Sequence, residues 1–244
     1  MPYQMKKGLS ASYLNGTLKC LRAYFKYAVQ EEFISSSPAD RVNWQKEGKV
    51  IIKTFSDSEV KALIEAFDYS DYLSARNRLI LTIAFDTGAR NTEICSIMKQ
   101  DIKGNMILIH GKGNKERYVP ITPYMQKAMF RYERLRDHYF EDRFLPTEHY
   151  LLSRTGRPLT KEAIEHIFNQ ANEKANVRSE IRCSPHTARH YNAQANLRNG
   201  LDVYSLSRLL GHENINITKR YLQSLQDEDI LKMAVKTSPI AALK

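Results

Sequence analysis

The spacing of apolar positions predicts a chain built mainly of helices. Between residues 10 and 29, leucine, phenylalanine and alanine recur at steps of three and four, which marks one face of an amphipathic helix. The positions on this face are Leu14, Leu18, Leu21, Phe25 and Ala28. The same periodicity predicts helices from Ser56 and from about Thr92, and over residues 74–86, 123–138, 160–175, 185–198, 202–210, 215–223 and 226–235.

Polar residues and glycines mark where several of these helices begin and end. Ser56 and Glu59 have the spacing of a capping box, and Phe55 and Val60 that of a hydrophobic staple. Asp202 is placed to cap a later helix. Gly88 and Gly211 follow periodic segments directly, so we expect helices to end there.

Helical periodicity is interrupted once, in the middle of the chain. Residues 106–110 and 117–121 read as two short strands joined by the turn GKGNK, and a further short strand is predicted near 150–152. The predicted fold class is therefore mostly α with a small antiparallel β-sheet, an α+β architecture.

Charge and composition narrow the classes of function. The chain has 244 residues with 37 Lys and Arg against 27 Asp and Glu, a net charge of +10, which favours a polyanionic partner. No apolar run approaches the ~20 residues that span a bilayer, and the first residues lack the apolar stretch of a secretory signal. Three widely spaced cysteines do not suggest a disulfide framework, so we expect a reducing, cytoplasmic location.

Four segments carry polar groups that helix or strand formation does not require. They are TGARNTE with Arg90 and Glu93, GKGNKERY with Lys112 and Lys115, HTARH with His186, Arg189 and His190, and LGH with His212, followed nine residues later by Tyr221. Each alone also fits a structural role: an exposed arginine after a helix cap, a solvated turn, or a packed tyrosine. Their joint occurrence favours a shared site.

A metal site at the third segment is the first alternative. His186 and His190 lie one helical turn apart and Cys183 is near, but a zinc protease motif needs glutamate where this chain has Thr187. The sequence offers no further ligand at a convincing spacing, so no metal is predicted.

In order and spacing, the four segments resemble the catalytic domain of the tyrosine recombinases, the phage-type integrase family, over about residues 55–235. Thr87, Gly88, Arg90 and Glu93 match the T-G-x-R-x-x-E motif, and Lys112 matches the hairpin lysine. His186, Arg189 and His190 match H-x-x-R-H, and Leu210, Gly211, His212 and Tyr221 match L-G-H with the nucleophile nine residues on. The resemblance implies the fold of that catalytic domain.

The resemblance also implies a role for each residue. Arg90 and Arg189 would bind the non-bridging oxygens of a DNA phosphodiester, with His212 as a third donor. Tyr221 would attack phosphorus and form a 3′-phosphotyrosine bond, His186 would accept the phenol proton, and Lys112, or Lys115 in its place, would protonate the leaving 5′-oxygen. Glu93 and His190 are supporting residues. The expected DNA contacts are Arg90, Lys112, Lys115, Arg117, Arg189, Lys219 and Arg220.

The family pattern further implies the domain organisation and the partners. Residues 1–46 would be the C-terminal part of a helical core-binding domain, 47–55 a linker, 56–235 the catalytic domain and 236–244 a C-terminal tail. The partners would be double-stranded DNA and three further copies of the chain, a homo-tetramer on DNA with exchange of the tail, together with accessory directionality proteins. No cofactor and no membrane are implied.

The implied function is site-specific recombination that integrates or excises a mobile element. A catalytically inactive DNA-binding regulator with the same fold is the alternative from a different class, although the full set of six catalytic residues argues against it. A type IB topoisomerase fits the lysine context and the chain length less well.

Overall fold

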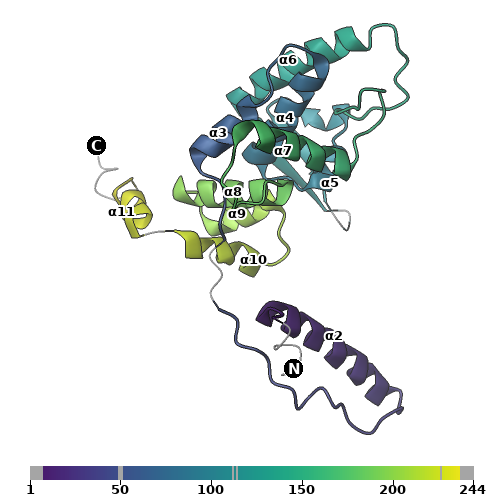
Figure 1. Ribbon diagram of the computed structural model, residues 1–244, viewed down its shortest axis with the longest axis vertical. Coiled ribbons are helices and arrows are strands. Elements are labelled where there is room, and N and C mark those ends of the chain that lie inside the picture. Colours follow the sequence, from purple (N-terminus) through teal and green to yellow (C-terminus); the bar gives the residue numbers. More distant parts are fainter. Residues whose placement is uncertain (1–7, 49–51, 112, 114, 226, 237–244) are drawn as a thin grey trace. The chain divides into compact units, whose positions relative to one another are not determined.

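The computed structural model describes residues 8–48, 52–111, 113, 115–225 and 227–236. The chain divides into two compact units, Met1–Val50 and Ile51–Lys244. Their elements are labelled in Figure 1. In the described ranges, no helix combines the length and the apolar character that crossing a membrane requires.

In its described residues, the first unit consists of helix α2, Ala11–Gln30, and the segment 31–48 that follows it, here called the return segment. The hydroxyl of Ser10 caps the helix by accepting a hydrogen bond from the backbone N–H of Tyr13. Asn15 and the backbone of Gln45 exchange two hydrogen bonds of 2.9 and 2.8 Å, and Arg22 donates to the carbonyl of Val42 at 2.8 Å. These contacts hold the return segment along one flank of the helix.

The predicted apolar face of α2 is only partly covered. Leu14, Leu18 and Ala28 are buried, and Phe25 is half-buried. Leu21, on the same face, is exposed. One helix cannot bury its own apolar face, and the return segment is hydrogen-bonded along the flank that carries Asn15 and Arg22.

The second unit is built around α4, Tyr72–Thr87, which is buried on nearly all sides. It packs against α3 (Asp57–Glu65), α6 (Pro123–Tyr139), α7 (Lys161–Ala175) and α8 (Pro185–Arg198), as Figure 1 shows. A helix with apolar residues all round is stable only inside such a ring of neighbours. The capping box of α3 is confirmed, with Ser56 and Glu59 bonded reciprocally at 2.7 and 3.2 Å.

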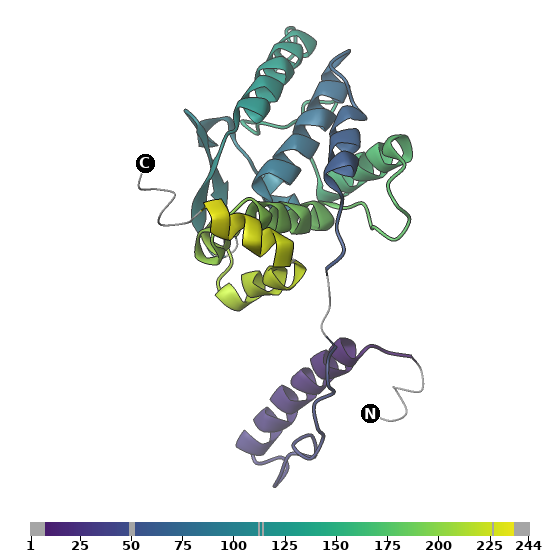
Figure 2. The same cartoon turned by 90° about the vertical axis from the view of Figure 1, so that its left-hand side faces the viewer.

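A three-stranded antiparallel sheet lies beside the helices (Figure 2). Strands β2 (Met106–His110) and β3 (Glu116–Pro120) form the predicted hairpin, with Leu108 opposite Tyr118. The structure adds a two-residue strand, β1 (Ile102–Lys103), that the sequence analysis missed. The mostly helical fold with a small antiparallel sheet is thus confirmed.

The predicted strand at 150–152 was wrong. The structure has only two isolated bridges in this region, Met98 with His149 and Leu152 with Pro158. Side chains occupy the backbone acceptors that a strand would use: the hydroxyl of Tyr132 donates to the carbonyl of Tyr150 at 2.8 Å, and that of Tyr72 to the carbonyl of Leu152 at 2.7 Å. This segment is therefore anchored to the helical core instead of to a neighbouring strand.

The C-terminal part carries α9 (Val203–Leu210), the short helix α10 (Ile215–Lys219) and α11 (Asp227–Lys236). Asp202 caps α9 and Gly211 ends it with a left-handed φ of 64°, as predicted. The helix predicted over 215–223 is instead α10 followed by a 3₁₀ turn at Arg220–Ser224. A small second core, separate from that around α4, consists of Ala193, Leu197, Leu206, Leu210 and Tyr221.

Gly88 ends α4 with a φ of 62°. A Cβ atom there would lie 2.7 Å from Leu210 Cδ2 and 2.8 Å from Asn192 Oδ1. We expect Gly88→Ala to lower the free energy of unfolding by about 3 kcal/mol, since it combines left-handed strain with overpacking.

Gly104→Ala is the matched control, because Gly104 has a φ of 60° but no atom within 4 Å of its would-be Cβ. Strain alone should then cost about 1–2 kcal/mol. Urea unfolding of both variants measures the difference, and equal losses would show that Leu210 and Asn192 move aside without cost.

Candidate active site

Arg90 is presented at the start of α5, Asn91–Cys95, directly after α4 ends at Gly88. The Glu93 carboxylate accepts hydrogen bonds from the Arg90 backbone N–H at 2.7 Å and from Arg90 Nη1 at 2.8 Å. The Arg90 side chain remains 43% exposed, whereas that of Glu93 is 4% exposed. The carboxylate therefore orients a guanidinium group that still faces solvent.

Arg189 extends from α8 and is 5% exposed. Its Nη1 donates to the carbonyl of Gly88 at 2.8 Å, and its Nη2 to that of Leu210 at 2.6 Å. Burial and the nearby charge of Arg90 lower the pKa of Arg189 to about 10, so this side chain is still a cation at neutral pH.

The C-terminal end of α9 brings three arginines together. The carbonyls of Leu209, Leu210 and Gly211 accept in turn from Arg117 at 2.7 Å, Arg189 at 2.6 Å and Arg90 at 3.4 Å. The last carbonyls of a helix have no partner within it and carry partial negative charge. This end thus holds cations that would otherwise repel one another.

His212 follows Gly211 and is a neutral donor in this arrangement. Its Nδ1 lies 2.7 Å from the hydroxyl of Thr218, which is fully buried. Burial, followed by the charges of Arg189 and Arg90, lowers the pKa of His212 to about 4. In the tautomer in which the threonine hydroxyl donates to Nδ1, the ring proton lies on Nε2 and can be donated to an anion.

Tyr221 lies in the 3₁₀ turn and is 2% exposed, within the second core. Its hydroxyl is 2.8 Å from Nδ1 of His190. Burial, followed by the charges of His186 and Arg220, lowers the pKa of His190 to about 4, and burial raises the pKa of Tyr221 against the opposing charges of Arg189 and Arg220. Both groups are therefore neutral at neutral pH in this conformation.

The structure changes the expected partner of the tyrosine. His186 is exposed at the start of α8, and its ring lies 4.2 Å from that of His190. The hydrogen bond to Tyr221 is made by His190, which the sequence analysis treated as a supporting residue. The motif places both histidines on one helix, but only the packing of the 3₁₀ turn decides which one the phenol reaches.

Of the two predicted hairpin lysines, the structure describes one. Lys112 lies outside the described residues. Lys115 is exposed and forms an ion pair of 2.8 Å with Glu213, which follows His212 in the chain. Lys219 and Arg220 are exposed on α10 and the 3₁₀ turn. Such exposed cations remain accessible to an anionic partner, because an exposed ion pair contributes little stability.

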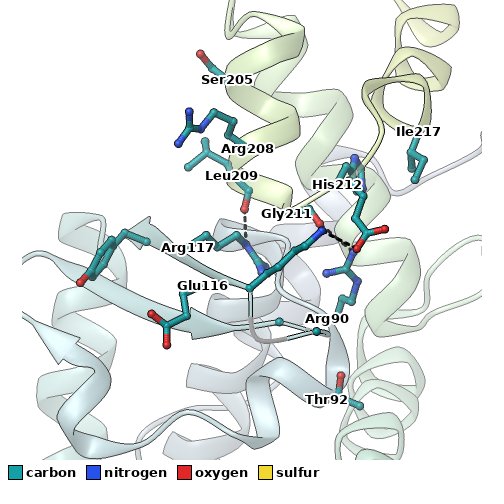
Figure 3. A pocket seen from close by; sticks show the side chains of 15 residues that line it. Arg90, Thr92, Glu116, Arg117, Ser205, Arg208, Leu209, Gly211, His212 and Ile217 are labelled. Atoms are coloured by element: carbon teal, nitrogen blue, oxygen red, sulfur yellow. Dashed lines mark hydrogen bonds and ion pairs between the residues drawn. The ribbon is translucent and has the colours of Figure 1, made fainter.

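Residues from the start of α5, from the β2–β3 hairpin and from α9 surround a cleft of about 1320 Å³ (Figure 3). Arg90, Arg117 and His212 line it together with the hairpin and α9. Ser205 and Arg208 of α9 also line it, and the sequence analysis missed both because nothing in the motif singles them out. Tyr221 does not line the cleft, because its side chain is packed in the second core.

Comparison with known proteins identifies relatives of the chain. Residues 53–228 match the model of the phage integrase family. The tyrosine recombinase XerC of Bacillus pumilus is 31% identical over 233 residues, covering 91% of this chain and 73% of the relative. XerC of Bacillus subtilis is 32% identical over 219 residues, with 88% and 71% covered.

Solved structures share the fold at lower identity. XerH site-specific recombinase, in a post-cleavage complex with a palindromic difH substrate, aligns with a TM-score of 0.72 at 20% identity, covering 96% of this chain and 69% of XerH. A lambda integrase tetramer bound to a Holliday junction aligns with a TM-score of 0.66 at 19% identity, covering 89% and 60%.

The imidazoles of His190 and His212 should titrate near pH 4. NMR titration of the histidine ring protons measures this, with His190→Gln to assign one resonance. His110 is the internal control, because its hydrogen bond to Asp101, and the charges of Asp101 and Glu116, raise its pKa.

The unfolded chain binds these two protons near pH 6.5. It then carries more protons than the folded chain between about pH 6.5 and 4, so the free energy of unfolding should fall as pH decreases through this window. Titration of both rings near 6.5 would show that the site is solvated.

Proposed function

The chain belongs to the phage integrase family and is a tyrosine-type site-specific recombinase, and we propose that it cuts and rejoins DNA through a 3′-phosphotyrosine bond formed by Tyr221. The biological event proposed is the integration or excision of a mobile element. The observation that carries the proposal is the arrangement of Arg90, Arg189 and His212 around the end of α9. Tyr221 lies in the 3₁₀ turn that follows α10.

The charge of this site suits a phosphodiester. Arg90, Arg117 and Arg189 surround one buried carboxylate, that of Glu93, so these side chains together carry an excess of positive charge. An anion that enters the cleft removes this imbalance. Forked guanidinium groups match the non-bridging oxygens of phosphate, on which negative charge increases in the transition state.

The proposed cleavage step is a transesterification. The Tyr221 oxygen forms a bond to phosphorus, the bond from phosphorus to the 5′-oxygen breaks, and Lys112 gives its proton to that oxygen. His190 accepts the phenol proton, because it already bonds the hydroxyl at 2.8 Å. A bound phosphate offsets part of the cationic field that lowers the pKa of His190, which makes the histidine a better base.

One phosphodiester replaces another in this step, so the energy of the broken bond is retained for rejoining. The 5′-hydroxyl of a second strand attacks the phosphotyrosine, and the reverse proton transfers restore the enzyme. No cofactor is needed to supply energy. In the described part of the chain, no group of three or more His, Cys, Asp or Glu side chains is arranged to hold a metal ion.

The proposed working form is a homo-tetramer on DNA, as in the lambda integrase tetramer bound to a Holliday junction. The first unit would act as the C-terminal part of a core-binding domain over 1–46, joined by a linker at 47–55 to a catalytic domain at 56–235. The tail at 236–244, which would dock on a neighbouring copy, lies outside the described residues except for Lys236.

Covalent trapping tests the chemistry. DNA bound by the chain would be selected from a randomised duplex pool, and the selected site synthesised with a nick next to the scissile phosphate, so that the released fragment diffuses away. We expect wild type, and not Tyr221→Phe, to form an adduct that survives a denaturing gel.

The control is DNA binding by Tyr221→Phe, which should equal that of wild type. Binding by wild type without any adduct would favour the alternative function, a DNA-binding regulator that has lost catalysis.

Salt dependence tests the DNA surface. We expect the affinity for the selected duplex to fall by at least about 100-fold between 50 and 200 mM salt, because cations that bind phosphates release counterions. Arg220→Gln should lower the slope of log K against log salt by about one.

The matched control is Lys127→Gln, an exposed lysine on α6, whereas Arg220 lies close enough to Tyr221 and His212 for its charge to act on both. It should leave the slope unchanged. Equal slopes for all three proteins would remove Arg220 from the DNA surface.

A further inference from the structure

Arg117 lies on β3, on the same face of the strand as the buried Val119. Its side chain is 10% exposed, unlike that of Arg90. Nη1 donates to Glu93 Oε1 at 3.0 Å and Nη2 to Glu93 Oε2 at 2.7 Å, a bidentate pair in which Glu93 is buried and Arg117 largely covered. The guanidinium group of Arg117 is therefore already bonded to protein acceptors in the absence of DNA.

A third contact joins Arg117 to the end of α9, where Nε donates to the carbonyl of Leu209 at 2.7 Å (Figure 3). The three nitrogens of the guanidinium group are therefore all bonded to acceptors within the protein. Arg117 thus connects β3, the start of α5 through Glu93, and the C-terminal end of α9.

Two glycines leave the space that this side chain occupies. A Cβ atom on Gly211 would lie 3.1 Å from Arg117 Nη1 and 3.2 Å from Arg117 Cδ. A Cβ on Gly111 would lie 3.7 Å from Glu93 Oε1 and 3.9 Å from Arg117 Nη1. The Arg117 side chain thus packs beside Gly211, which directly precedes His212, and near Gly111.

We propose that Arg117 is a positioning residue of the recombinase, which aligns Arg90, through Glu93, with His212, through the end of α9, and does not itself bind DNA. The inference rests on the proposed function and replaces the expectation that Arg117 contacts DNA. It requires the forked geometry of arginine, because a lysine at the same position offers one point charge and cannot join both carboxylate oxygens to the Leu209 carbonyl.

The protonation of Glu93 provides a readout that a general loss of packing would not change. Burial alone would raise the pKa of this carboxyl, but the hydrogen bonds and charge of Arg117, with those of Arg90, lower it to about 2. In Arg117→Lys one point charge replaces the forked pair, so fewer hydrogen bonds oppose the effect of burial and the pKa of Glu93 should rise. Cleavage by the variant should then decrease on the acidic side of its pH profile, where the wild type stays active.

The test compares Arg117→Lys, Glu93→Gln and Arg117→Met/Glu93→Gln with wild type, on the nicked duplex and in binding titrations. We expect Arg117→Lys to lower the cleavage rate by about 100-fold or more, as misplacement of a catalytic group does. Its salt slope and affinity for DNA should equal those of wild type. The pH profile of Arg117→Lys should gain an acidic limb that is absent from the profiles of wild type and Glu93→Gln.

The double variant protects the test against misfolding, because it removes both buried charges and leaves neither unpaired. If Arg117 acts through Glu93, the double variant cleaves no more slowly than the slower of Arg117→Lys and Glu93→Gln. Multiplying effects in the double variant, or a salt slope that decreases by about one when the charge at 117 is removed, would overturn the proposal and assign a direct DNA contact.

The two hypotheses fail in different ways. Absence of an adduct with wild-type protein counts against the proposed recombination chemistry. An active wild type with an equally active Arg117→Lys counts only against the positioning role. The salt slopes require binding alone, so they decide whether Arg117 contacts DNA even where no cleavage occurs.

Discussion

The carboxylate of Glu93 is buried between two arginines that reach it from different parts of the chain. Arg90 approaches from the same short helix, and Arg117 from a strand 24 residues later. Burying a carboxylate is costly unless charge and hydrogen bonds compensate it, and here four donated hydrogen bonds do so. Loss of either arginine would leave the buried carboxylate less well compensated, so both ion pairs are kept. The pair with Arg117 thereby holds the hairpin against α5 along one side of the cleft.

The C-terminal end of α9 compensates charge in a similar way, here the positive charge of three arginines. A site for a phosphodiester needs several cations close together, and they repel one another before the phosphate binds. Burial, together with the charges nearby, lowers the pKa of His190 and His212 to about 4 and that of Arg189 to about 10. The carbonyls of residues 209–211 offset part of this repulsion. The protein thereby holds a cationic cleft in shape without DNA.

Tyr221, the proposed nucleophile, is held inside the protein in this structure. It packs in the second core, with its hydroxyl 2.8 Å from Nδ1 of the neutral His190. Burial raises the pKa of Tyr221, and the charges of Arg189 and Arg220 oppose that increase. The same two arginines would therefore favour the phenolate that the proposed reaction needs.

Local rules determined much of this protein from its sequence. The capping box at Ser56, the left-handed helix ends at Gly88 and Gly211, and the hairpin follow from interactions between residues a few positions apart, which the printed chain displays. Only the tertiary structure decided that Tyr221 bonds His190, that Arg117 is buried on Glu93, and that side chains take the backbone acceptors at 150–152. These contacts join residues between 18 and 80 positions apart, and their geometry depends on how whole elements pack. Periodicity states which face of an element is buried, but not which partner it meets there.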